Sequence, residues 1–187
     1  MGNPLHEYRT PFDLAESSQL VEISSKIGDF DRLTEIAGAN LAALDANRIP
    51  QNWRDREVRG ELCFGFVDAQ SRVPALEGHL AASLDAVCQR CLEPFVLPLK
   101  TELRLIFDGE QAGQKDGEDY EVWELDDQRL DLAELVQEAL IMTIPFVTMH
   151  DDDASCSVTA VADEKSDEQE KMTLPFANLK KQMQQED

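Results

Sequence analysis

The chain is poor in positive charge, in aromatic side chains and in long apolar runs. It has 17 lysines and arginines against 38 aspartates and glutamates, a formal net charge of −21, and only 6% aromatic residues. This surplus of acid repels bulk polyanions and attracts basic proteins, unless it serves only to keep the protein soluble. No apolar run approaches the roughly 18 residues of a membrane-spanning helix, and none follows Met1, so we expect a cytoplasmic protein.

Recognisable catalytic motifs are also lacking. The sequence has no glycine-rich phosphate loop, no His-Glu-x-x-His and no nucleophile elbow. The three histidines are His6, His79 and His150, and each is read more simply as a surface group than as a general base. The sequence therefore predicts a protein that is not an enzyme.

What the chain does have is a long stretch of alternating apolar and polar residues. Residues 58–66, 76–88 and 95–107 each alternate with a period of two, which is typical of strands with one buried face. The short connection between the first two segments allows an antiparallel hairpin. We expect three consecutive strands in a meander, with a sheet that could curl toward a barrel, a possible strand at 20–27 and a short edge strand at 122–125.

Two segments carry helical periodicity instead. One runs from Phe30 to Leu44 and must end before Pro50. The other begins after Asp131, which can cap it, and stops before Pro145. The predicted fold class is thus α+β: an antiparallel sheet flanked by two helices, one before the meander and one after it.

Acidic residues concentrate in two segments outside these elements. Residues 108–119 are rich in Gly, Asp and Glu and predict an exposed loop. We expect residues 1–150 to form a single α+β domain, and residues 151–187 to form an acidic, largely disordered tail with a short terminal helix starting near Pro175.

Four cysteines in a cytoplasmic protein favour free thiols or a metal over structural disulfides. Cys88 and Cys91 lie two residues apart, between two of the expected strands, and His150 with Cys156 could complete a tetrahedral zinc site. A reduced, packed thiol pair and redox chemistry are the alternatives. A thioredoxin-like role is disfavoured because Pro94 and the strand pattern after it oppose the helix that this motif requires.

A short basic stretch suggests contact with RNA. Trp53 could stack on a base, and several arginines could bind phosphates: Arg48, Arg54, Arg56 and Arg59, with Arg90 added at the cysteine turn. The alternative is that Trp53 belongs to the core and that the arginines balance nearby acid.

The segment from Cys88 to Phe95 resembles the YceD family, the large ribosomal RNA subunit accumulation proteins. The residues of the motif are Cys88, Arg90, Cys91, Leu92, Pro94 and Phe95. The similarity continues through Leu130-Asp131-Leu132, the helix end at 139–145 and Pro175-Phe176-Ala177, and spans most of residues 30–181. Many relatives carry a further cysteine pair where this chain has His150 and Cys156.

The resemblance implies a role in synthesis, processing or stability of large-subunit (23S) ribosomal RNA, without an enzymatic activity. The acidity of the chain favours a protein-mediated route, in which it binds a basic ribosomal protein or a large-subunit assembly factor. Direct RNA binding through the stretch from Arg48 to Arg59 is the second hypothesis. A cysteine-based redox enzyme is the third.

Overall fold

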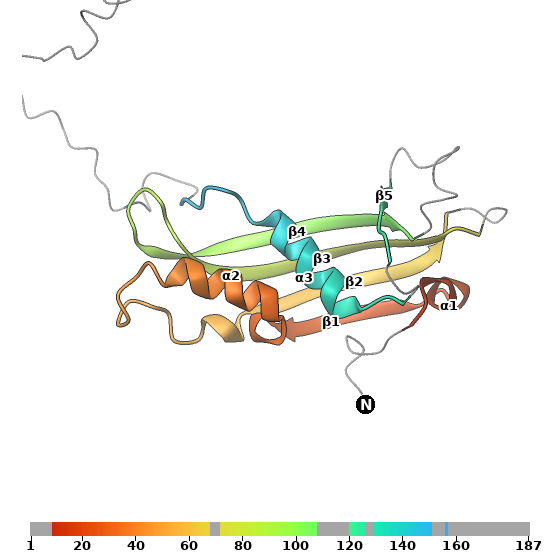
Figure 1. The fold of residues 1–187 in the computed structure, drawn as a ribbon, viewed down its shortest axis with the longest axis horizontal. Helices are drawn as coiled ribbons and strands as arrows, with labels where there is room; N and C mark the ends of the chain where they lie inside the picture. Colours follow the sequence, from red (N-terminus) through yellow and green to blue (C-terminus); the bar gives the residue numbers. More distant parts are fainter. Residues whose placement is uncertain (1–8, 68–71, 108–119, 126–128, 151–155, 157–187) are drawn as a thin grey trace, which may run out of the picture. The chain divides into compact units, whose positions relative to one another are not determined.

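A computed structural model describes residues 9–67, 72–107, 120–125, 129–150 and 156 (Figure 1). The predicted acidic loop, most of the predicted tail and its terminal helix lie outside these residues. Within the described residues, no helix is long and apolar enough to cross a membrane.

A five-stranded sheet forms the centre of the described part. Its strands follow one another in space as they do in the sequence: β1 (Leu20–Lys26), β2 (Glu57–Phe66), β3 (Pro74–Val87), β4 (Pro94–Ile106) and β5 (Glu121–Val122). The first four strands pair antiparallel, so the predicted meander and the possible strand at 20–27 are confirmed. The prediction of a purely antiparallel sheet is wrong, because β5 runs parallel to β4. A parallel partner needs a crossover of a dozen or more residues, and the chain between Ile106 and Glu121 is long enough to supply one.

The register places apolar side chains on one face of the sheet. Leu84 of β3 lies opposite Leu97 of β4, and both are buried. Intervening positions in the middle of the strands, such as Glu61 and Glu77 on β2 and β3, are exposed. Toward the strand ends this separation fails, since Ala75, Asp85 and Ile106 are buried. The alternation read from the sequence therefore separates the two faces in the middle of the sheet.

Two helices cover the apolar face, which is why the sheet does not close into the barrel considered above (Figure 1). Helix α2 (Asp31–Leu41) buries Leu33, Ala37 and Leu41. Helix α3 (Leu132–Thr143) buries Leu132, Leu135, Val136 and Leu140. The Asp131 carboxylate accepts hydrogen bonds from the N–H groups of Ala133 and Glu134, at 2.8 and 3.2 Å, so the predicted cap is confirmed. Two 3-10 helices, Ile27–Asp29 and Trp53–Asp55, flank the segment that contains α2.

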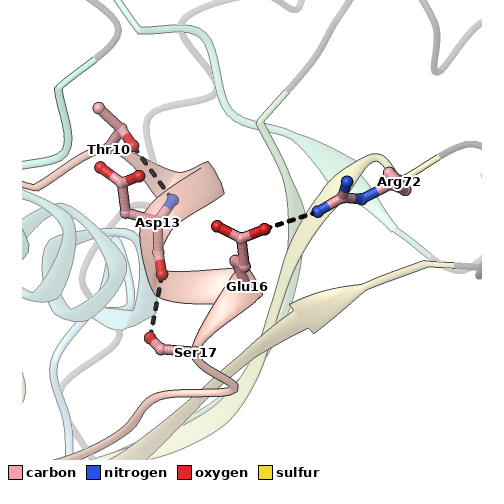
Figure 2. Close-up of polar contacts among 5 residues, drawn as sticks. All are labelled: Thr10, Asp13, Glu16, Ser17 and Arg72. Carbon is pink, nitrogen blue, oxygen red and sulfur yellow. Dashed lines mark hydrogen bonds and ion pairs between the residues drawn. The ribbon is translucent and has the colours of Figure 1, made fainter.

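A third helix, α1 (Pro11–Glu16), was not predicted. The Thr10 hydroxyl oxygen caps it by accepting a hydrogen bond from the Asp13 N–H at 3.1 Å (Figure 2). Glu16 forms an ion pair of 3.1 Å with Arg72, just before β3 (Figure 2). Its six residues are too few for helical periodicity to show in the sequence, although Thr10 and Pro11 together mark a helix start.

Candidate metal centre

The connection between β3 and β4 is a tight turn that carries both neighbouring cysteines. The Cys88 N–H donates to the Glu93 carbonyl at 2.9 Å, and the Leu92 N–H donates to the Cys88 carbonyl at 2.8 Å. Leu92 adopts a left-handed φ of 58°, which reverses the chain direction at the cost of some backbone strain. The prediction that Cys88 and Cys91 close a strand connection is confirmed.

The segment that follows α3 lies against this turn and is held there by Thr148. The Thr148 hydroxyl donates to the Val87 carbonyl at 2.7 Å, and its own carbonyl accepts from the Gln89 N–H at 2.9 Å. Asn40 of α2 holds the same strand end, because its side-chain oxygen accepts from the Val87 N–H at 2.8 Å. Thr148 is only 4% exposed, so these hydrogen bonds are protected from water. They fix the backbone next to His150.

Together the turn and this segment gather four potential metal ligands. The ligand atoms of Cys88, Cys91, His150 and Cys156 all lie within 4.8 Å of one another. The Cys91 sulfur is 3.7 Å from Nδ1 of His150, whose ring lies 4.8 Å from that of Phe95, measured between centroids. Cys88 and Cys156 are buried, and all four cysteines of the chain are free of disulfides. The four residues named from the sequence as a possible metal site are therefore brought together, and they could hold an ion.

The environment of Cys88 favours its thiolate. Burial acts to raise the pKa of this thiol, but hydrogen bonds from the backbone N–H groups of Cys91, His150 and Arg90, and from the Cys91 side chain, outweigh it. The net effect lowers the pKa of Cys88 from 9.0 to about 6. A thiolate is the form of cysteine that ligates metals.

The basic stretch forms no comparable cluster, because three of its arginines are paired with acid. Arg56 donates two hydrogen bonds to the buried Asp85, at 2.7 and 2.8 Å. Arg48 lies 2.6 Å from Glu93, and Arg59 lies 2.5 Å from Glu57 on the same strand.

The two remaining arginines contact neighbouring side chains. Trp53 is half-buried and packs against the core, and the Arg54 guanidinium lies 4.8 Å from the centroid of its ring. Arg90 reaches the Met149 sulfur at 4.0 Å. Trp53, Arg48, Arg56 and Arg59 thus have the contacts that the alternative reading, core plus charge balance, expects, and RNA contact through this stretch stays a prediction.

Sequence reasoning missed Thr148 and Asn40, because a single polar residue gives no signal of the distant backbone that it will contact.

Sequence reasoning also missed the exposed apolar side chains beside the cluster. Phe146 is fully exposed, Val147 is about half exposed, and Leu92 at the turn is 63% exposed. The signal available was the apolar content of residues 146–149, which His150 separates from three aspartates.

The described residues thus form an α+β domain with a candidate metal site. In this site His150 and Cys156 lie against the turn that carries Cys88 and Cys91. A family model described as large ribosomal RNA subunit accumulation protein YceD matches residues 76–181, which is more than half of the chain. The chain belongs to the YceD family. Comparisons with curated proteins and with solved structures found no match. The family match includes all four cluster residues but not residues 30–75, over which the resemblance was expected to extend.

Proposed function

We propose that the protein is a non-enzymatic factor of ribosome biogenesis that supports the synthesis, processing or stability of 23S ribosomal RNA. The observation that carries this proposal is the family match, which spans most of β3 and all of β4, α3 and the cysteine turn.

The protein acts on ribosomal RNA through a protein partner that is basic, either a ribosomal protein or a large-subunit assembly factor. Its net charge of −21 opposes direct association with a polyanion and favours a basic surface. The pairing of Arg48, Arg56 and Arg59 with carboxylates supports the same view, because a neutralised arginine contributes little to phosphate binding.

Exposed apolar side chains near the cluster would anchor this partner. Phe146, Val147 and Leu92 protrude from the segment and the turn that contact each other through Thr148. Protein interfaces gain most of their affinity from a few such anchors, while surrounding charge steers association. Met142, in the last turn of α3, is 84% exposed and adds a further apolar side chain.

The decisive test compares cells with and without the gene. Cells lacking the protein should contain less 23S relative to 16S ribosomal RNA and fewer large subunits in a sucrose gradient, and expression of the intact chain should restore both. An unchanged ratio and subunit profile in slow and fast growth would reject the role in ribosome biogenesis.

The route is tested by affinity purification at moderate salt with and without ribonuclease. A basic large-subunit protein that stays bound after ribonuclease treatment supports the protein-mediated route, and its retention should fall as salt is raised. Loss of all partners after ribonuclease would favour direct RNA binding. Replacement of Arg54 and Arg59, which are both exposed, should then weaken RNA binding without unfolding the domain.

A further inference from the structure

We propose that Cys88, Cys91, His150 and Cys156 bind one Zn²⁺ ion in a closed, structural site that fastens the segment after α3 to the β3–β4 turn. This inference concerns the fold of the protein and is independent of the ribosomal role.

The spacing of the donor atoms fits a tetrahedral ion. Zinc bonds of about 2.3 Å to sulfur and about 2.0 Å to nitrogen place tetrahedral ligands roughly 3.8 Å apart for two sulfurs and roughly 3.6 Å apart for sulfur and nitrogen. The distance from the Cys91 sulfur to Nδ1 of His150 is 3.7 Å, close to the expected edge. The largest separation in the cluster, 4.8 Å, exceeds the sulfur–sulfur edge by about 1 Å, which a small rotation of a side chain can remove.

The identity of the donors selects both the metal and the kind of site. Three thiolates and one imidazole are soft and borderline ligands that suit Zn²⁺ and do not suit Mg²⁺ or Ca²⁺. Four protein ligands leave no open position for water or substrate, as in structural zinc sites. Because Cys88 and Cys156 are buried, the ion would be shielded from solvent.

The surrounding hydrogen bonds hold the ligands in place. Backbone N–H groups of Arg90, Cys91 and His150 point to the Cys88 sulfur, as they would to a metal-bound thiolate. Thr148 fixes the backbone two residues before His150, and the Phe95 ring lies against the imidazole. Cys91 and His150 are 59 residues apart in the sequence. The turn and the segment that carry them thus meet through contacts that do not themselves require the ion.

The first test measures metal in protein purified under reducing conditions without chelator. We expect about one equivalent of zinc in the intact chain, and less than about a tenth in Cys88→Ser and Cys156→Ser. Cys63→Ser is the matched control, since Cys63 is exposed on β2 outside the cluster and should keep the full equivalent. His150→Ala should also lose most of the zinc, and His79→Ala, at an exposed strand position, is its control and should keep the metal. Equal metal loss in the controls, or no zinc in reduced and folded intact protein, overturns the proposal.

The second test uses Co²⁺ to report the geometry. Titration of reduced, metal-free protein with Co²⁺ should give the intense visible bands of a tetrahedral ion and thiolate charge transfer in the near ultraviolet, both saturating at about one equivalent and both lost on addition of Zn²⁺. A weak, octahedral spectrum overturns the site. If Cys156→Ser fails to fold, Cys156→His supplies a different zinc ligand and should retain the metal with lower affinity.

Metal removal should also loosen one defined contact. Chelation should speed exchange of the Gln89 amide hydrogen, which donates to the Thr148 carbonyl, by at least about tenfold, while amides in the centre of β3 stay protected. Unchanged exchange at Gln89 on loss of zinc would show that the ion does not fasten the two segments.

Discussion

Replacing Arg56 with alanine should destabilise the domain, because Arg56 neutralises a carboxylate that water cannot reach. Asp85 of β3 is 3% exposed, and the Arg56 Nε and Nη2 atoms donate to its two oxygens at 2.7 and 2.8 Å. Both oxygens are satisfied by one planar guanidinium, a geometry that a lysine cannot reproduce. Without Arg56, the Asp85 carboxylate would be buried without its partner or would draw water into the sheet.

The size of the effect follows from the burial of the two partners. Removing one member of a fully buried pair costs about 3–5 kcal/mol, but the Arg56 side chain is 38% exposed and solvent screens part of the interaction. We therefore expect a loss of about 2 kcal/mol in the free energy of unfolding, which for a chain of this size lowers Tm by about 4–8 °C. The pKa of Arg56 is raised, chiefly by its hydrogen bonds to Asp85, so the arginine stays charged throughout the usual pH range.

The assay is urea unfolding followed by circular dichroism, with two comparisons. Arg59→Ala removes an exposed pair, with side chains 69% and 65% accessible, and should cost less than about 0.5 kcal/mol. The double replacement Arg56→Met with Asp85→Leu should recover most of the stability lost in Arg56→Ala, since no charge is left buried. If Arg56→Ala kept the stability of the intact chain but weakened RNA binding, the structural role argued here would be refuted and Arg56 would become an RNA contact.

Three further substitutions test other parts of the molecule. Asp131→Ala removes the cap of α3 and should cost about 1 kcal/mol in the same unfolding assay, whereas a change below about 0.3 kcal/mol would show that the cap is dispensable. Gly78→Ala should cost more than about 2 kcal/mol, because the added methyl would overlap the Glu61 carbonyl oxygen on the neighbouring strand; full stability would show that the strands separate easily. Phe146→Ser should leave stability within about 0.5 kcal/mol and weaken retention of the basic partner, and undiminished retention would exclude this anchor.

The central part of the fold was predictable because its signals are local. Alternation over residues 76–88 and 95–107 gives strands that differ from β3 and β4 by one or two residues at each end. Asp131 and Pro145 likewise limit α3 in the sequence. In such segments the side chains that will be buried are neighbours on one face, so a short window contains the information.

The features that were missed depend on contacts between distant segments. The parallel pairing of β5 with β4 covers only two residues, and nothing in residues 121–122 distinguishes it from an antiparallel edge. The closure of the sheet into a barrel depends on whether helices occupy its apolar face, which a strand pattern does not reveal. Cys88 and Cys91 were named from their spacing between two strands, and His150 and Cys156 from residue type. Their proximity could not be derived, because it depends on Thr148 and on the path of the chain after α3.

The position of the cluster connects the cysteine turn of the family motif with the exposed apolar side chains proposed to anchor a partner. The cysteine turn by itself presents Leu92, and the segment after α3 by itself presents Phe146 and Val147. Each is too short to hold an ordered surface alone, because ordering a residue costs about 1–2 kcal/mol in backbone entropy. The hydrogen bonds of Thr148 join the two, and a bound ion would add four bonds at the same junction. Loss of the metal should therefore weaken partner binding by loosening the two segments that present Leu92, Phe146 and Val147. Phe146→Ser should weaken partner binding while the metal is retained. Metal loss therefore tests the ordering of the apolar surface, and Phe146→Ser tests the contact that this surface makes with the partner.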